Sequence, residues 1–140
     1  MKLMRASAVT LILILTLLAG FQLSNAGDRG AVLYDEAFQY YKSLASDPDK
    51  VQNKEIWETI AKTFFSIYID YSDSEKAPDA LFVSSKMYEE MGERFNSQYD
   101  LDKSVEYSRI LVRKYPHISL ADDEQLRVAR VVEMHSKSEP

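Results

Sequence analysis

The chain has 140 residues, of which 22 are acidic and 17 are basic, and its formal net charge is −5 at neutral pH. It contains no cysteine, which excludes disulfide bonds, thiolate metal sites and cysteine nucleophiles. The acidic balance also argues against binding to nucleic acid or to anionic lipid head groups.

The N-terminal segment has the pattern of a secretory signal peptide. Lys2 and Arg5 form a positively charged start, and an apolar stretch follows. Ser24 and Ala26 are the small residues that a signal peptidase reads, so we expect cleavage after Ala26 and a periplasmic or otherwise exported protein. An uncleaved membrane anchor is the alternative. Phe21 stands where a lipoprotein would carry its lipid-bearing cysteine, so the protein is not expected to be a lipoprotein.

Hydrophobic periodicity predicts five helices and no strand in the rest of the chain. Apolar residues recur at three- and four-residue steps over residues 31–44, which gives the first helix an apolar face. Asp47 and Pro48 suit the start of a second helix, whose apolar stripe runs from Ile56 to Tyr71. We therefore expect one long helix over this part of the chain.

Three further helices follow. Ser74 is the expected N-cap of the third helix, and Gly92 is its expected end. Asp100 is the expected cap of the fourth helix, which ends at Tyr115 because a proline follows. Ser119 is the expected cap of the fifth. The implied boundaries are residues 1–26 for the signal peptide, 27–135 for the helical domain and 136–140 for a disordered tail.

A short pattern occurs twice in the chain, with a spacing of 44 residues. A fixed period of this size predicts stacked helical hairpins. The copies also differ, because Ala80 in the first copy corresponds to Glu124 in the second. The matching pairs are Tyr71 with Tyr115, Ala77 with Ala121, and Asp79 with Asp123.

This pattern resembles the segment between helices in the tetratricopeptide-like repeats of bacterial envelope proteins. Those proteins include the Tol-Pal cell-division coordinator and an outer-membrane assembly lipoprotein. Residues 31–132 look most like a module that precedes the catalytic domain of some N-acetylmuramoyl-L-alanine amidases. The resemblance implies an all-α fold of antiparallel helical hairpins, with about five helices. The repeat-signature residues that it assigns to the fold are Trp57, Phe64, Tyr71, Ala77, Asp79, Tyr115, Pro116, Ala121 and Asp123.

No residue pattern indicates a catalytic, metal or cofactor site. The two histidines, His117 and His135, have no recognised metal-ligand spacing. The acidic runs at residues 89–90 and 122–124 favour a solvated surface or helix capping, because adjacent residues of a helix point apart. The zinc site of an amidase, built from several histidines and glutamates, has no recognisable counterpart.

Tyrosines are the best candidates for partner contacts, since tyrosine joins a large apolar area to a polar tip. We single out Tyr40, Tyr68 and Tyr99 as candidate partner-binding residues. The alternative is that the aromatic residues fill the seams between helices, which we favour for Trp57, Phe64 and Tyr71.

These observations favour an exported, non-enzymatic adaptor that mediates protein–protein interaction in the bacterial cell envelope. It would bind its partner through the concave face that stacked hairpins create. Neither a cofactor nor nucleic acid is expected, and self-association through an uncapped end face is a further hypothesis. The alternative function is an accessory peptidoglycan-binding subunit that assists a separate cell-wall amidase.

Overall fold

The computed structural model describes residues 27–136, with side chains as far as residue 133. The expected signal peptide and the last four residues of the tail lie outside this part of the chain. The described residues are helical, and no strand occurs among them. This part of the chain contains six helices: α2 (Arg29–Ala45), α3 (Pro48–Val51), α4 (Lys54–Asp70), α5 (Ala77–Arg94), α6 (Gln98–Lys114) and α7 (Ser119–Ser136).

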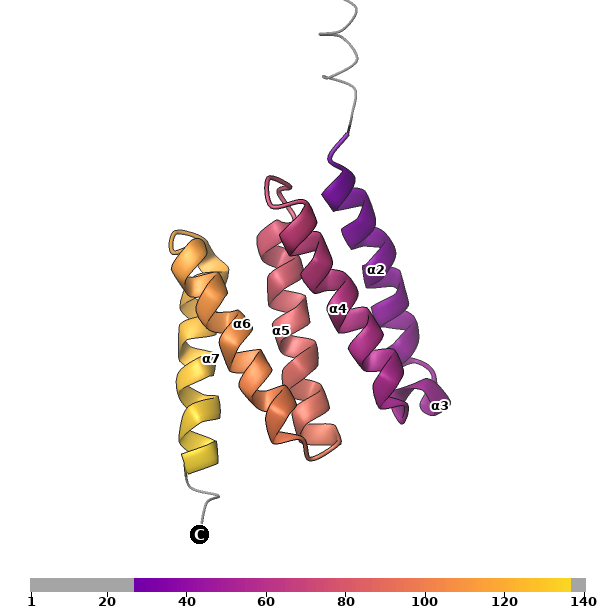
Figure 1. Cartoon of the computed structure of the whole chain (residues 1–140), viewed down its shortest axis with the longest axis vertical. Coiled ribbons are helices and arrows are strands. Elements are labelled where there is room, and N and C mark those ends of the chain that lie inside the picture. The colour runs from indigo at the N-terminus through magenta and orange to yellow at the C-terminus, as the bar shows by residue number, and fades with distance from the viewer. Residues whose placement is uncertain (1–26, 137–140) are drawn as a thin grey trace, which may run out of the picture.

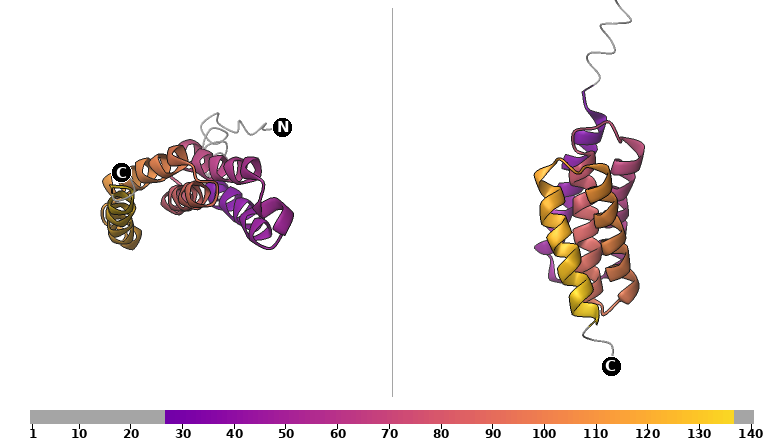
Figure 2. Two further views of the ribbon diagram at one scale, coloured as in Figure 1. Left: turned by 90° about the horizontal axis from the view of Figure 1, so that it is seen from below. Right: turned by 90° about the vertical axis from the view of Figure 1, so that its left-hand side faces the viewer.

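The long helices run alternately up and down, so that neighbours in sequence are antiparallel neighbours in space (Figure 1). Seen from one end, α4 and α6 lie in one layer, while α2, α5 and α7 lie in the other (Figure 2). Helix α5 packs against both α4 and α6 and also contacts α2. The stack therefore has two ends, one formed by α2 with α3 and α4, the other by α6 and α7.

The expectation of a single helix from residue 47 to residue 71 is wrong. Asp47 does cap a helix, because its Oδ1 accepts the N–H groups of Asp49 and Lys50 at 3.1 and 3.3 Å. That helix, α3, ends after one turn, because the side chain of Asn53 caps a new helix by accepting the N–H of Glu55 at 3.0 Å. The extra cap divides the expected helix into α3 and α4 and brings the number of helices within residues 27–136 to six.

Two expected caps have other roles. Ser74 precedes α5 by more than the capping distance, and its hydroxyl donates to Asp28 Oδ2 at 2.8 Å, which ties the start of α2 to this turn. Asp100 lies inside the first turn of α6, after the N-cap position of Ser97. Its carboxylate is 1% exposed and pairs with Lys54 of α4 at 2.6 Å, so it joins two helices.

Helix α5 does not end at Gly92 but continues to Arg94. The turn that follows places Asn96 at a φ of 51°, and the N–H of Ser97 bonds the carbonyl of Gly92 at 2.9 Å. This is the hydrogen bond of a Schellman motif, in which asparagine is an accepted substitute for glycine. The glycine serves a different purpose, since a Cβ at position 92 would lie 2.5 Å from Leu101 Cδ2 and 3.0 Å from its backbone nitrogen.

The 44-residue pattern has the same backbone geometry in both copies. Tyr71 has φ −127° and ψ 50°, and Tyr115 has φ −127° and ψ 55°. In each copy the tyrosine N–H bonds the carbonyl four residues earlier, and the N–H three residues later bonds the tyrosine carbonyl. These distances are 3.0 and 2.9 Å in the first copy and 2.8 and 3.3 Å in the second. Equivalent residues therefore end α4 and α6 in the same way.

Candidate functional site

An apolar groove opens between α2, α3 and α4, at the N-terminal end of the stack. Its volume is about 630 Å³. The side chains that line it come from the second half of α2, from α3 and the turn after it, and from the first half of α4. They are Ala37, Tyr40, Ser43, Leu44, Lys50, Asn53, Glu55, Ile56, Thr59, Ile60 and Thr63.

The serine and threonine hydroxyls of this lining are already used within their own helices. Ser43 Oγ donates to the carbonyl of Tyr40 at 2.8 Å. Thr59 Oγ1 and Thr63 Oγ1 donate to the carbonyls of Glu55 and Thr59, at 2.8 and 2.9 Å. Because these donors are engaged, the groove offers an occupant mainly methyl groups, methylene groups and an aromatic ring. Its chemistry suits an apolar surface better than a sugar, whose many hydroxyls need hydrogen-bond partners.

The three candidate tyrosines lie on three different helices. Tyr40 on α2 is 68% exposed and lines the groove. Tyr99 on α6 is 65% exposed but lies outside the groove, with the Lys103 ammonium 5.7 Å from its ring centre. Tyr68 on α4 is only 6% exposed and packs against Phe65, with ring centres 5.6 Å apart. Tyr40 is thus the candidate best placed for a partner in this groove.

The signature residues mostly hold helices together. Trp57 donates its indole N–H to the carbonyl of Val51 at 3.0 Å, which fixes α3 on α4. Asp79 pairs with Lys76 at 3.1 Å in the first turn of α5. Trp57, Phe64, Ala77 and Ala121 are buried, Tyr71 and Tyr115 are half-buried at helix ends, and Pro116 and Asp123 are exposed.

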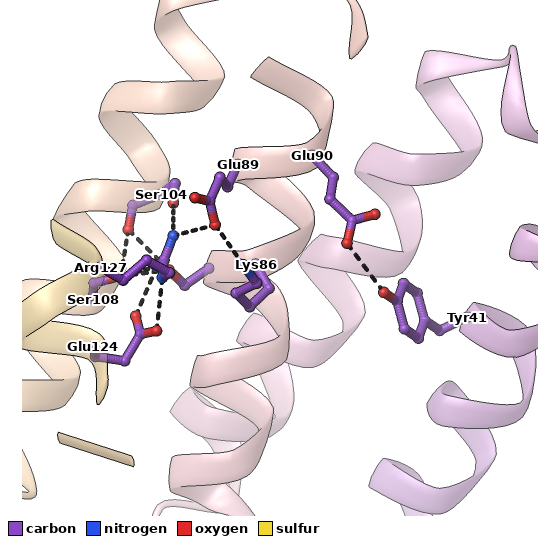
Figure 3. Close-up of polar contacts among 9 residues, drawn as sticks. Tyr41, Lys86, Glu89, Glu90, Ser104, Ser108, Glu124 and Arg127 are labelled. Atoms are coloured by element: carbon purple, nitrogen blue, oxygen red, sulfur yellow. Dashed lines mark hydrogen bonds and ion pairs between the residues drawn. The ribbon is translucent and has the colours of Figure 1, made fainter. Parts of the chain in front are cut away.

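A second feature, which the sequence analysis missed, is a buried polar network between α5, α6 and α7 (Figure 3). Arg127 of α7 lies at its centre. The Nε and Nη2 atoms donate to the two carboxylate oxygens of Glu124, each at 2.7 Å. Nη1 donates to Glu89 Oε2 of α5 at 2.5 Å, and Lys86 Nζ lies 2.7 Å from the same oxygen. One guanidinium thus joins two carboxylates from different helices.

Three fully buried serines complete this network. Arg127 donates to Ser104 Oγ at 3.1 Å, to Ser85 Oγ at 2.5 Å and also to Ser108 Oγ. The hydroxyls of Ser85 and Ser108 each donate to the backbone carbonyl of Ser104 at 3.0 Å. Since Ser85 belongs to α5 and the other two serines to α6, the network connects three helices through one side chain.

The expectation of a solvated acidic surface is therefore wrong for Glu89 and Glu124, which are 9% and 1% exposed. Both are buried because Arg127 supplies a charge-assisted partner inside the protein. Asp122 and Asp123 do lie at the surface. The 44-residue register holds a signal for this site: Glu124 and Arg127 occupy the positions of Ala80 and Val83, which are buried in the first copy.

The electrostatics of the network indicate a structural role. Burial lowers the pKa of Arg127, but its hydrogen bonds and the nearby charges of Glu124 and Glu89 outweigh this effect and raise the pKa above its usual value. The guanidinium consequently stays charged, and it is saturated by carboxylate and hydroxyl acceptors. The arrangement fixes the relative positions of helices rather than moving a proton.

Other site types have little support among the described residues. No group of three or more histidine or acidic side chains is placed to hold a metal ion in residues 27–133. His117 is exposed in the turn before α7, and the side chain of His135 lies outside the described part. None of the helices described is both long enough and apolar enough to cross a membrane.

Comparison of the chain with protein-family models, with curated proteins and with solved structures gives no match.

Proposed function

We propose that this protein is an exported, non-enzymatic helical-repeat adaptor, which binds a partner protein in the bacterial cell envelope. The observation that carries the proposal is the open apolar groove of about 630 Å³ between α2 and α4. A groove of this size, with its serine and threonine hydroxyls already bonded, favours recognition by apolar contact. The repeated turn at Tyr71 and Tyr115 supports a tetratricopeptide-like arrangement of hairpins, a scaffold type that acts by binding.

Export rests on the sequence pattern that ends at Ala26. The full chain is expressed in a bacterium with a C-terminal tag, and its intact mass and cell fraction are measured. A mass that begins at Gly27, in the periplasmic fraction, agrees with the proposal. A retained N-terminus in the membrane fraction supports the anchored alternative, and a full-length cytosolic protein contradicts export.

Affinity capture from an envelope extract tests the adaptor function. The tagged full chain is compared with a Tyr40→Ala variant in the groove and a Tyr99→Ala variant outside it. Both tyrosines are exposed, so neither change should disturb the fold. One envelope protein that is retained by the parent and by Tyr99→Ala, and lost with Tyr40→Ala, is the expected result. Equal retention by all three baits contradicts binding in the groove.

The second candidate function is an accessory peptidoglycan-binding subunit for a separate amidase. The exposed rings of Tyr40 and Tyr99 favour it, because aromatic faces can stack on sugar rings. Sedimentation with purified sacculi separates the candidates. A protein that co-sediments, and does so less after Tyr99→Ala, supports the second function, whereas a pure protein adaptor stays in the supernatant.

A further inference from the structure

Comparison of equivalent positions in the two repeat copies indicates what kind of segment fits the groove. Helices α4 and α6 have the same length of 17 residues, and both ends of α6 lie 44 residues after those of α4. Under this register, Ile56 and Thr63 of the groove correspond to Asp100 and Tyr107 of α6. The residues around Asp100 and Tyr107 therefore indicate what kind of segment could cover Ile56 and Thr63.

On α6, the equivalent side chains are covered by α4. Lys54 Nζ of α4 lies 2.6 Å from Asp100 Oδ2. The ring of Phe65, also on α4, stacks on Tyr107 with centres 4.2 Å apart and planes within 5°. As a result, Asp100 is 1% exposed and Tyr107 is 6% exposed.

On α4, no helix of the described chain lies over the corresponding positions. Thr63 is exposed, Ile56 is partly exposed, and both line the groove. Moreover, α2 precedes α4 in the stack as α5 precedes α6 (Figure 1). The groove is lined by residues of α2, α3 and α4. An occupant of the groove would therefore lie against α2 and α4 in the same way as α4 lies against α5 and α6. Its natural occupant is a helix.

The chemistry of the lining defines that helix further. Where α6 presents the charged Asp100, α4 presents the aliphatic Ile56, so the occupant needs an apolar stripe at that point. Glu55 is the one lining carboxylate, and it has no ion pair within the described residues, whereas Lys50 is already paired with Asp47 at 3.1 Å. With a chain of net charge −5, the free carboxylate favours a basic partner.

We propose that the groove between α2 and α4 is the seat of a basic amphipathic helix from a partner protein, which packs on α4 as α4 packs on α6. This inference rests on the proposed adaptor function and adds the site and the class of partner. The apolar stripe of the helix contacts Ile56, Ile60 and the exposed ring of Tyr40, and a lysine or arginine near one end pairs with Glu55. The polar face of the helix remains in water.

The test uses the full chain and a defined probe. The probe is a fluorescein-labelled peptide of 17 residues, the length of α4, made of leucine, alanine and lysine with leucine at helical spacing. Two control peptides have the same composition in scrambled order, or glutamate in place of lysine. Fluorescence anisotropy gives the affinity of each peptide at low and at physiological salt.

Three variants locate the binding. Thr63→Trp fills the groove from an exposed position, and Glu55→Gln removes the charge. Tyr99→Ala is the matched control, an exposed change outside the groove. We expect Thr63→Trp to weaken the parent peptide by about tenfold or more, as loss of a central contact does. Glu55→Gln should weaken it by only about two- to fivefold at low salt, because exposed ion pairs contribute little. Tyr99→Ala should leave binding unchanged.

Several outcomes overturn the proposal. Equal binding of the scrambled peptide shows charge attraction without a helix seat, and equal binding to Thr63→Trp shows that the groove is not used. A dimer that Thr63→Trp abolishes in sedimentation makes a second copy of this chain the occupant instead. If the envelope partner is captured normally by Thr63→Trp, the adaptor function stands and the helix seat is wrong. If the peptide binds in the groove but no partner is captured, the seat stands and the adaptor function fails.

Discussion

Replacing Arg127 by methionine should destabilise this protein more than any single surface change. The guanidinium bonds both oxygens of Glu124 at 2.7 Å and one oxygen of Glu89 at 2.5 Å. Methionine keeps most of the apolar length of the side chain and removes every one of these bonds. Two buried carboxylates then lose their main partner, while the volume of the site changes little.

The expected loss of unfolding free energy depends on which partners the two carboxylates keep. Glu89 keeps its ion pair with Lys86 at 2.7 Å, so it loses only part of its electrostatic stabilisation. Glu124 is 1% exposed and pairs only with Arg127 in the described part of the chain, so it is left as an unpaired buried carboxylate. Breaking a buried pair by removing one partner costs about 3–5 kcal/mol, and we place this variant near the lower end. A domain of this size has about 5–15 kcal/mol of stability in total.

Urea unfolding, followed by far-UV circular dichroism, measures this cost. For a small domain the slope is about 1–3 kcal/mol per molar urea, so a loss of about 3 kcal/mol lowers the midpoint by about 1–3 M. The decisive comparison is a double variant that also carries Glu124→Leu. It replaces the whole pair by apolar groups of similar volume. The first repeat copy also has apolar residues at these positions, the smaller Ala80 and Val83.

The double variant should recover most of the lost stability, since apolar replacement of a buried ion pair is often neutral or stabilising. The serines do not prevent this, because Ser85 and Ser108 still donate to the carbonyl of Ser104 at 3.0 Å. If Arg127→Met costs less than about 1 kcal/mol, or if the double variant is no more stable than the single one, the reasoning about an unpaired carboxylate is wrong.

Changes at three further positions test the packing and the electrostatics by the same unfolding assay. Gly92→Ala should cost about 1–3 kcal/mol, because its Cβ would contact the side chain and backbone nitrogen of Leu101; an unchanged midpoint would disprove this tight approach. Asn96→Gly should be neutral or slightly stabilising, and Asn96→Val should cost about 1–2 kcal/mol, since φ is 51° there. Burial raises the pKa of Glu90 above its usual 4.5, although Tyr41 donates a hydrogen bond to it at 3.4 Å. The ionised form therefore opposes folding above the folded-state pKa, and this penalty is lost as the pH falls through that pKa toward 4.5. Glu90→Gln should accordingly stabilise the protein at pH 7 but not at pH 4, and an equal effect at both values would contradict this origin.

Helical periodicity and turn chemistry were sufficient to predict most of the fold. The proline after Tyr115 ends α6, and the apolar stripe of α4 leads to the buried Phe64 and Ile67. The break before α4 was missed because an asparagine in a helical pattern is a weak signal until its side chain is seen to accept the N–H of Glu55. Local rules thus located the helices, but a choice between two competing caps needed the structure.

The polar network was beyond these rules for a different reason. Acidic residues at the start of a helix are usually solvated, and Glu124 with Arg127 three residues later reads as an ordinary surface pair. Their burial depends on Glu89, which lies 38 residues before Arg127 in the chain and meets it only after folding. The same limit applies to the tyrosines. Tyr40 and Tyr68 both lie in helical segments of similar composition, so the sequence did not indicate which of them is buried.

Charged residues have different roles at the contacts between helices of this chain and at the open groove. Where a neighbouring helix is supplied by the same chain, ion pairs with a buried carboxylate fix the contact. Asp100 of α6 pairs with Lys54 of α4, and Glu89 of α5 pairs with Arg127 of α7. Such pairs add little net stability but penalise any shifted arrangement, since a shift leaves a buried charge alone. At the open end, position 56 is isoleucine instead. An apolar groove can bind several related helices. Selection among them then depends on polar residues of the lining, such as Glu55. The internal contacts therefore favour one register, whereas the proposed helix seat would accept a class of partners.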